Sequence, residues 1–192
     1  MQIDAATAAV IAAIIGAIVG GFFALFGQWL ERKSERKKER ESVRAGIMAE
    51  IQAILDIVER RHYITGLSNF INEIKDGSTN LFQRRIAKDY DIVFRSNCGK
   101  LGLLPSETVA KTVRFYYMVS SIVQDLVLLQ DASELPSLRT RYGLNTQAGN
   151  QAFHEQMLEL SVETVELGND LIRKYEVGPR KDRRGVDLIS DE

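Results

Sequence analysis

The chain has 192 residues, of which 27% are charged and 45% hydrophobic, an ordinary balance for a folded protein. Beyond the first 30 residues it is long enough for one domain with a core, but not for two. The net charge is −1, whereas nucleic-acid-binding domains usually carry a basic excess, so we expect no nucleic-acid partner. The single cysteine, Cys98, excludes an intramolecular disulfide.

Residues 5–27 contain no charged side chain. As a helix with a rise of ~1.5 Å per residue, this segment spans roughly 35 Å, enough for a bilayer core of ~30 Å. A buried core helix normally keeps a polar face, and a signal peptide has basic residues before its apolar run. Here the first four residues are Met-Gln-Ile-Asp. We therefore predict a transmembrane helix over residues 5–30, with residues 1–4 outside the membrane.

The charges after this segment predict its orientation. Residues 31–44 hold seven basic and four acidic residues, a balance of 7 − 4 = +3. The positive-inside rule then places the rest of the chain in the cytosol, as a protein of the bacterial inner membrane. Basic and interfacial aromatic side chains here are expected to contact lipid headgroups: Trp29, Arg32, Lys33, Arg36, Lys37, Lys38 and Arg40.

Small residues recur along the predicted span in two adjacent rows, while most of the bulky residues lie away from them. Small residues let membrane helices approach closely, and Gly-x-x-x-Gly is the familiar pattern. Because each chain offers one span, its partner must be another chain, so we predict a homo-oligomer. The packing face comprises Ala12, Gly16, Gly20, Gly21 and Ala24.

The cytosolic part begins with a charged juxtamembrane helix over residues 31–44. Apolar residues then recur at helical spacing, which predicts that the helix continues to about His62: Val43, Ile47, Ile51, Ile54 and Val58. The period resumes after Gly66, and residues 76–80 predict a turn. A shorter helix is predicted over residues 83–97, with one apolar face: Ile86, Tyr90, Val93 and Phe94.

Gly99 is expected to end that helix in a left-handed cap, and Pro105 to open the next, which runs to about Gln130. Its predicted inward side chains are Val109, Val113, Tyr116, Tyr117, Ile122, Val123, Leu126 and Val127. Residues 131–147 are expected to form a loop, 148–176 a last long helix, and 177–192 a disordered tail. The predicted fold is therefore all-α, a membrane helix leading into a four-helix, bundle-like cytosolic domain over residues 45–176.

No catalytic, cofactor-binding or metal site emerges from the residue patterns. Glu59 and His62 have the spacing of half a di-iron site, but the second half is missing. His154 is expected to be solvated or interfacial. One acidic row on the last helix could bind a basic partner, although a solvated helix face is the favoured explanation: Glu155, Glu159, Glu163, Glu166 and Asp170.

The layout resembles a loosely defined group of small bacterial and prophage single-pass membrane proteins. The resemblance rests on the Gly/Ala-rich span that runs into Glu-Arg-Lys repeats over residues 12–44, and on residues 101–105 (LGLLP) followed by Phe115-Tyr116. In layout the chain is also similar to CRISPR accessory proteins that form membrane pores. This resemblance implies an oligomeric, pore-type effector in antiviral defence.

Two other functions remain open. The span could serve only as an anchor for a helical domain that recruits a cytosolic protein partner. A phage lysis protein is disfavoured, because it would place its helical domain outside the inner membrane, against the charge pattern. An enzyme is not expected under any of these hypotheses.

Overall fold

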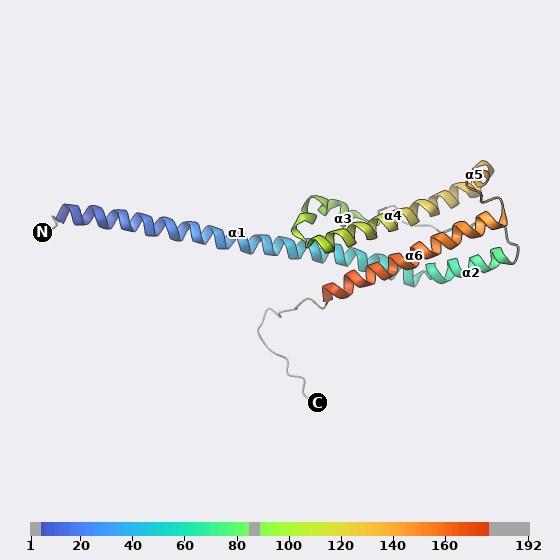
Figure 1. The fold of residues 1–192 in the computed structure, drawn as a ribbon, viewed down its shortest axis with the longest axis horizontal. Coiled ribbons are helices and arrows are strands. Elements are labelled where there is room, and N and C mark those ends of the chain that lie inside the picture. The colour runs from blue at the N-terminus through green and yellow to red at the C-terminus, as the bar shows by residue number, and fades with distance from the viewer. Residues whose placement is uncertain (1–4, 85–88, 177–192) are drawn as a thin grey trace, which may run out of the picture. The chain divides into compact units, whose positions relative to one another are not determined.

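The computed structural model describes residues 5–84 and 89–176, with side chains for residues 28, 29, 31–84 and 89–175. The chain divides into two compact units, Met1–Val43 and Arg44–Glu192. Throughout the described residues the secondary structure is helical and contains no strand (Figure 1). The all-α prediction is therefore confirmed.

Helix α1 runs from Ala5 to Arg60 without a break, so the predicted continuation to about His62 is confirmed. The predicted packing face of the span (Ala12, Gly16, Gly20, Gly21 and Ala24) lies outside the described side chains. Of the predicted headgroup-binding residues, Trp29 and Lys33 are in contact, with the Lys33 ammonium 5.1 Å from the centre of the indole ring. In the part of the chain whose side chains are described, no helix is long and apolar enough to cross a membrane.

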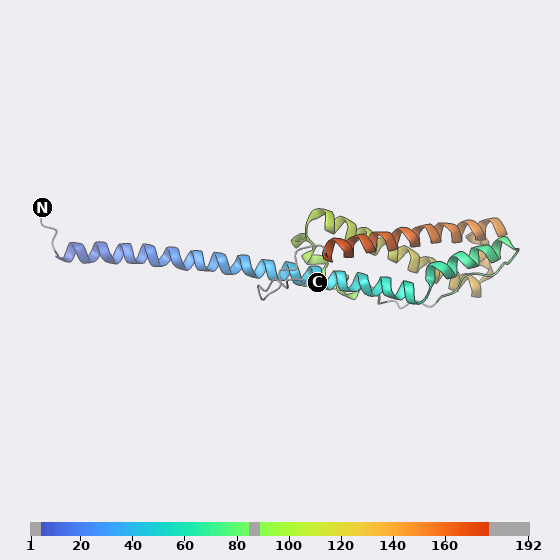
Figure 2. The same cartoon turned by 90° about the horizontal axis from the view of Figure 1, so that it is seen from below.

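The second unit is a bundle of long helices. Helix α2 (Tyr63–Lys75) and helix α4 (Ser106–Glu134) both pack against α6 (Gln147–Glu176). The last turns of α1 and the whole of α2 follow one another end to end (Figures 1 and 2). The long helices of this unit therefore form three rods. The end of α1 and the whole of α2 make the first rod, which is broken at residues 61–62, and α4 and α6 make the other two.

His62 is the point where the first rod bends. Its φ of +51° places it in the left-handed region, which residues other than glycine adopt infrequently. Before the bend Ile47 and Ile51 are fully buried, and after it Leu67, Ile71 and Ile74 are buried. The buried apolar residues therefore face the core both before and after the bend.

Helix α6 crosses α1 and α4 closely at Gly168. A Cβ atom at this position would lie 2.8 Å from the Phe115 ring and 3.0 Å from the Leu55 side chain. Such distances are too short for any side chain, so the glycine permits this crossing.

The predicted helix over residues 83–97 is wrong. Helix α3 covers only Ile92–Asn97, and a 3-10 helix, η1, follows over Cys98–Leu103. Leu81 and Phe82 are buried in a non-helical segment, held there by tertiary contacts that helical spacing does not reveal. Ile86, one of the predicted inward residues, lies outside the described residues.

Two predictions about chain breaks are also wrong. Gly99 lies in η1, and among the described residues the glycines with a positive φ are Gly77 and Gly143 instead. Residues 131–147 are not a loop, because α4 continues to Glu134 and a short helix, α5, spans Pro136–Arg141. Pro136 at the first position of α5 explains the restart, since its fixed φ suits the first turn of a helix.

The face that helix α4 presents to the core matches the predicted one only in part, since Tyr116 and Leu126 are buried as predicted. Val113, Tyr117 and Val127 were expected inside but are 44%, 75% and 43% exposed. Thr112, Phe115, Met118, Val119 and Leu129 are buried instead. Apolar residues surround much of this helix, so spacing alone does not identify the side on which its neighbours pack.

Candidate functional site

The helical domain contains an apolar cavity of about 160 Å³ between the end of α1, the start of α2 and the middle of α4 and α6. Phe82 and Tyr90 complete the wall from the segment between α2 and α3. The helices contribute mainly aliphatic and aromatic side chains, namely Ile54, Leu55, Ile57, Val58, Ile64, Leu67, Phe115, Val119, Ile122, Val123, Leu126, Met157 and Val165.

The two hydroxyl groups that α6 contributes to the wall are already engaged. Ser161 donates a hydrogen bond to the Met157 carbonyl oxygen at 2.7 Å, and Thr164 donates to the Leu160 carbonyl oxygen at 2.6 Å. An ordered water needs two to four polar partners, and these hydroxyls have no proton left to offer. The interior therefore suits apolar groups better than water.

The rim of the cavity lies at the bend between α1 and α2. Ile57 is 51% exposed there, and Arg61 and Tyr63 also line the cavity. Arg61 and Tyr63 flank His62, which holds the left-handed conformation. The exposed edge of the cavity thus lies beside the break in the first rod.

The cavity leaves apolar side chains of four helices without packing partners on one side. A ligand that fills the space would bury this apolar surface and gain dispersion contacts. The cavity is therefore the strongest candidate for a binding site in the described part of the chain.

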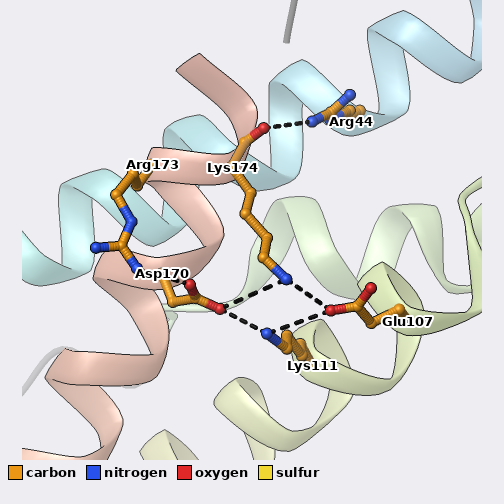
Figure 3. A network of polar contacts seen from close by, with 6 residues as sticks. All are labelled: Arg44, Glu107, Lys111, Asp170, Arg173 and Lys174. Carbon is orange, nitrogen blue, oxygen red and sulfur yellow. Dashed lines mark hydrogen bonds and ion pairs between the residues drawn. The ribbon is translucent and has the colours of Figure 1, made fainter. Parts of the chain in front are cut away.

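A network of charged residues joins α1, α4 and α6 at one end of the bundle (Figure 3). Lys111 lies 2.6 Å from Asp170 and 3.4 Å from Glu107, and Lys174 lies 2.6 Å from Glu107. Arg44 donates a hydrogen bond to the Lys174 carbonyl oxygen at 3.2 Å. The ammonium groups lower the pKa of both carboxyl groups, chiefly through hydrogen bonds from Lys174 to Glu107 and from Lys111 to Asp170.

The predicted acidic row lies on α6, and the domain's own basic residues engage three of its five members. Glu155 pairs with Lys75 at 3.4 Å, Glu163 with Arg114, and Asp170 with Lys111. No ion pair is found for Glu159 or Glu166 among the described residues, and both are exposed. Much of the charge of this face therefore serves to join α6 to α2 and α4.

The prediction that His154 is solvated or interfacial is wrong, because this side chain is fully buried. Its Nδ1 donates to the Asn150 carbonyl oxygen at 2.7 Å, and its Nε2 accepts the Phe82 backbone N–H at 3.4 Å. The Phe70 and Phe153 rings lie 5.0 and 5.6 Å away, centre to centre. Burial lowers the pKa of the ring, so the neutral form joins α6 to the buried segment at Phe82.

Glu50 positions helix α3, a structural role that its place in the sequence does not reveal. Its carboxylate accepts the backbone N–H groups of Val93 and Phe94 at 2.8 and 2.9 Å, in the first turn of α3. It also accepts the Tyr116 hydroxyl at 2.7 Å. Burial, together with the neighbouring carboxylate, raises the pKa of Tyr116. Glu50 thus fixes both the start of α3 and its place against α4.

No cluster of three or more metal-ligating side chains is found among the described residues. Glu59 and His62 lie on either side of the end of α1, and His62 is exposed. The cavity was not predicted from the sequence, since its lining residues have the same spacing as ordinary core positions. The chain matches no family model, and no curated protein or solved structure matches it at a significant level.

Proposed function

We propose that this chain is a single-pass protein of the bacterial inner membrane that self-associates and acts as an oligomeric effector on membrane permeability. Residues 5–27 supply an uncharged segment long enough for the bilayer, and seven basic residues follow within 31–44. The observation that carries self-association is the set of small residues within that segment, Ala12, Gly16, Gly20, Gly21 and Ala24.

Continuity of α1 supports a role for the helical domain in controlling the span. The same helix that contains residues 5–27 also supplies Ile54 and Leu55 to the cavity wall. A pore lined by alanine, glycine and isoleucine tends to dewet and stay closed at rest. Such an effector therefore needs a trigger, and the domain at the other end of the helix is the part of the chain that could receive one.

A second candidate function is a membrane-tethered module that recruits a cytosolic protein. The observation that favours it is the exposed apolar side of α4, where Tyr117 is 75% exposed with Val113 and Val127 on the same helix. Exposed aromatic and aliphatic side chains of this kind are common in protein interfaces. Under this hypothesis the span only anchors the domain.

One pair of substitutions separates the two functions. Gly16→Ile with Gly20→Ile should push neighbouring spans apart, lowering the mass of the oligomer while leaving membrane insertion intact. Ile14→Ala is the matched control on the bulky side of the span. The effector hypothesis predicts that the double variant loses dye leakage from overexpressing cells. Leakage that persists at a reduced oligomer mass contradicts it, and an unchanged mass contradicts the packing face.

A further inference from the structure

We infer that the apolar cavity of the helical domain is a binding site for a neutral hydrocarbon group about the size of a benzene ring. The site can be tested separately from the proposed membrane function, because every residue in its wall belongs to the second unit. Two sources could supply such a group: a free small apolar molecule, or the end of a lipid acyl chain.

The size of the cavity sets the size of the ligand. Its volume is about 160 Å³, and an apolar protein cavity of roughly 150 Å³ binds benzene or xenon and excludes water. The aromatic rings of Phe82 and Phe115 and the branched side chains of α1 and α4 offer dispersion contacts on several sides. A charged or strongly polar ligand would lose its hydration without compensation.

The polar groups of the wall restrict the ligand further. The hydroxyl groups of Ser161 and Thr164 donate to carbonyl oxygens within α6 and so cannot donate to a guest. A ligand that needs a hydrogen-bond donor deep in the site would therefore remain unsatisfied. Arg61, Tyr63 and Tyr90 supply the other polar groups of the wall, and the rest of the lining is aliphatic or aromatic, which suits a hydrocarbon group.

A ligand in the cavity could also change the conformation of the protein at the rim. The rim includes the end of α1 and the start of α2, which meet at the left-handed His62. A guest that spreads these helices would change the angle between the two parts of the first rod. A ligand shifts such an equilibrium only as far as it prefers one state.

Toluene titrated into the full chain tests the site directly, in lipid nanodiscs or, if the chain stays soluble without them, in buffer. Methyl NMR should show saturable shifts at Ile54, Ile64 and Ile122, which line the cavity, and none at Ile47 and Ile74. Shifts that grow linearly without saturation, or that are equal at both sets of methyl groups, would overturn the inference.

A matched pair of substitutions on α4 controls for general effects. Val123 lines the cavity, whereas Val127, one turn later, is 43% exposed. Val123→Phe should fill the site and weaken toluene binding by about tenfold or more, while Val127→Phe should leave it within about twofold. Val123→Ile adds a single methylene and serves if the larger change prevents folding. Unchanged affinity in the folded Val123 variants contradicts the inference.

Lipid labelling separates the two sources of the hydrocarbon group. If an acyl chain end is the occupant, contacts between lipid-chain protons and the Ile122 methyl group appear in nanodiscs and vanish with chain-deuterated lipid. If they are absent while toluene still saturates, the natural occupant is a free small molecule. Absence of both lipid contacts and saturable toluene binding rejects the site.

Discussion

Glycine occurs in different settings in the two units of this protein. In the first unit, Gly16, Gly20 and Gly21 belong to a long uncharged segment in which small residues recur at helical spacing. In the second unit, Gly168 occupies a crossing where a Cβ atom would lie 2.8 Å from the Phe115 ring. Close approach between chains is proposed for the first set, whereas close approach within one chain is observed for the second.

These two settings predict that substitutions in one unit change the stability of the domain, whereas substitutions in the other change the association of chains. Substitution of a glycine at a crossing inside the bundle acts on folding of the domain. Substitution within residues 5–27 should act on association and leave the domain folded, because the two compact units have separate packing. The predictions below start with the variants that separate these effects most strongly.

The largest effect is expected for Gly168→Val. The new side chain must displace Phe115 and Leu55, and overpacking of this kind typically costs about 1–3 kcal/mol or more. Urea unfolding followed by circular dichroism measures the loss. Gly102→Val is the control, since no atom lies within 4 Å of a Cβ placed there. Equal midpoints for both variants would contradict the observed helix crossing.

A smaller effect is expected from acidification, through His154. Its folded-state pKa is lowered by burial, so the unfolded chain binds the proton more readily. The stabilisation is complete above the unfolded pKa of ~6.5 and is lost as the pH falls toward the lower folded pKa. The slope can reach about 1.4 kcal/mol per pH unit for one proton.

His154→Phe removes the titrating group and provides the comparison for that prediction. The free energy of unfolding of the native protein should fall faster between pH 7 and pH 5 than that of the variant. The variant also loses the bond from the Phe82 backbone N–H, so its stability at pH 7 should be lower. Identical pH slopes would mean that His154 is not held neutral in the folded state.

The smallest effect is expected at the charged end of the bundle. Glu107→Gln removes a partner of both Lys111 and Lys174. These groups are accessible to solvent, so salt screens them and their contribution to stability is modest. The melting temperature should therefore change little, but its dependence on salt should weaken. A large loss of helicity in Glu107→Gln would show that the network does more than join three helix ends.

The sequence predicted the long helices well and the short elements poorly. The ends of α1 and α6 lie within two residues of their predicted positions, because each helix keeps a regular apolar period over many turns. Helix α3 was misjudged because its start depends on the Glu50 carboxylate, which is 43 residues distant in sequence from Val93. No local pattern carries that information.

The acidic face of α6 and the apolar cavity could also be predicted from the sequence to different extents. Acidic side chains on α6 could be recognised as one face, since spacing alone places them there. Their partners could not, because Lys75, Lys111 and Arg114 come from helices far away in the sequence. The cavity could not be predicted from the sequence for a related reason. Ile122 and Val123 have the spacing of core residues, and only the packing shows that space remains beside them.

The central claim is that residues 5–30 cross the inner membrane with the helical domain in the cytosol. A topology reporter fused after Glu192, combined with alkaline carbonate extraction of the membranes, tests it most directly. We predict that the chain stays in the membrane fraction, that the reporter is active only in the cytosolic orientation, and that protease added to spheroplasts leaves the domain intact. Release by carbonate, or digestion of the domain from the periplasmic side, would contradict the account.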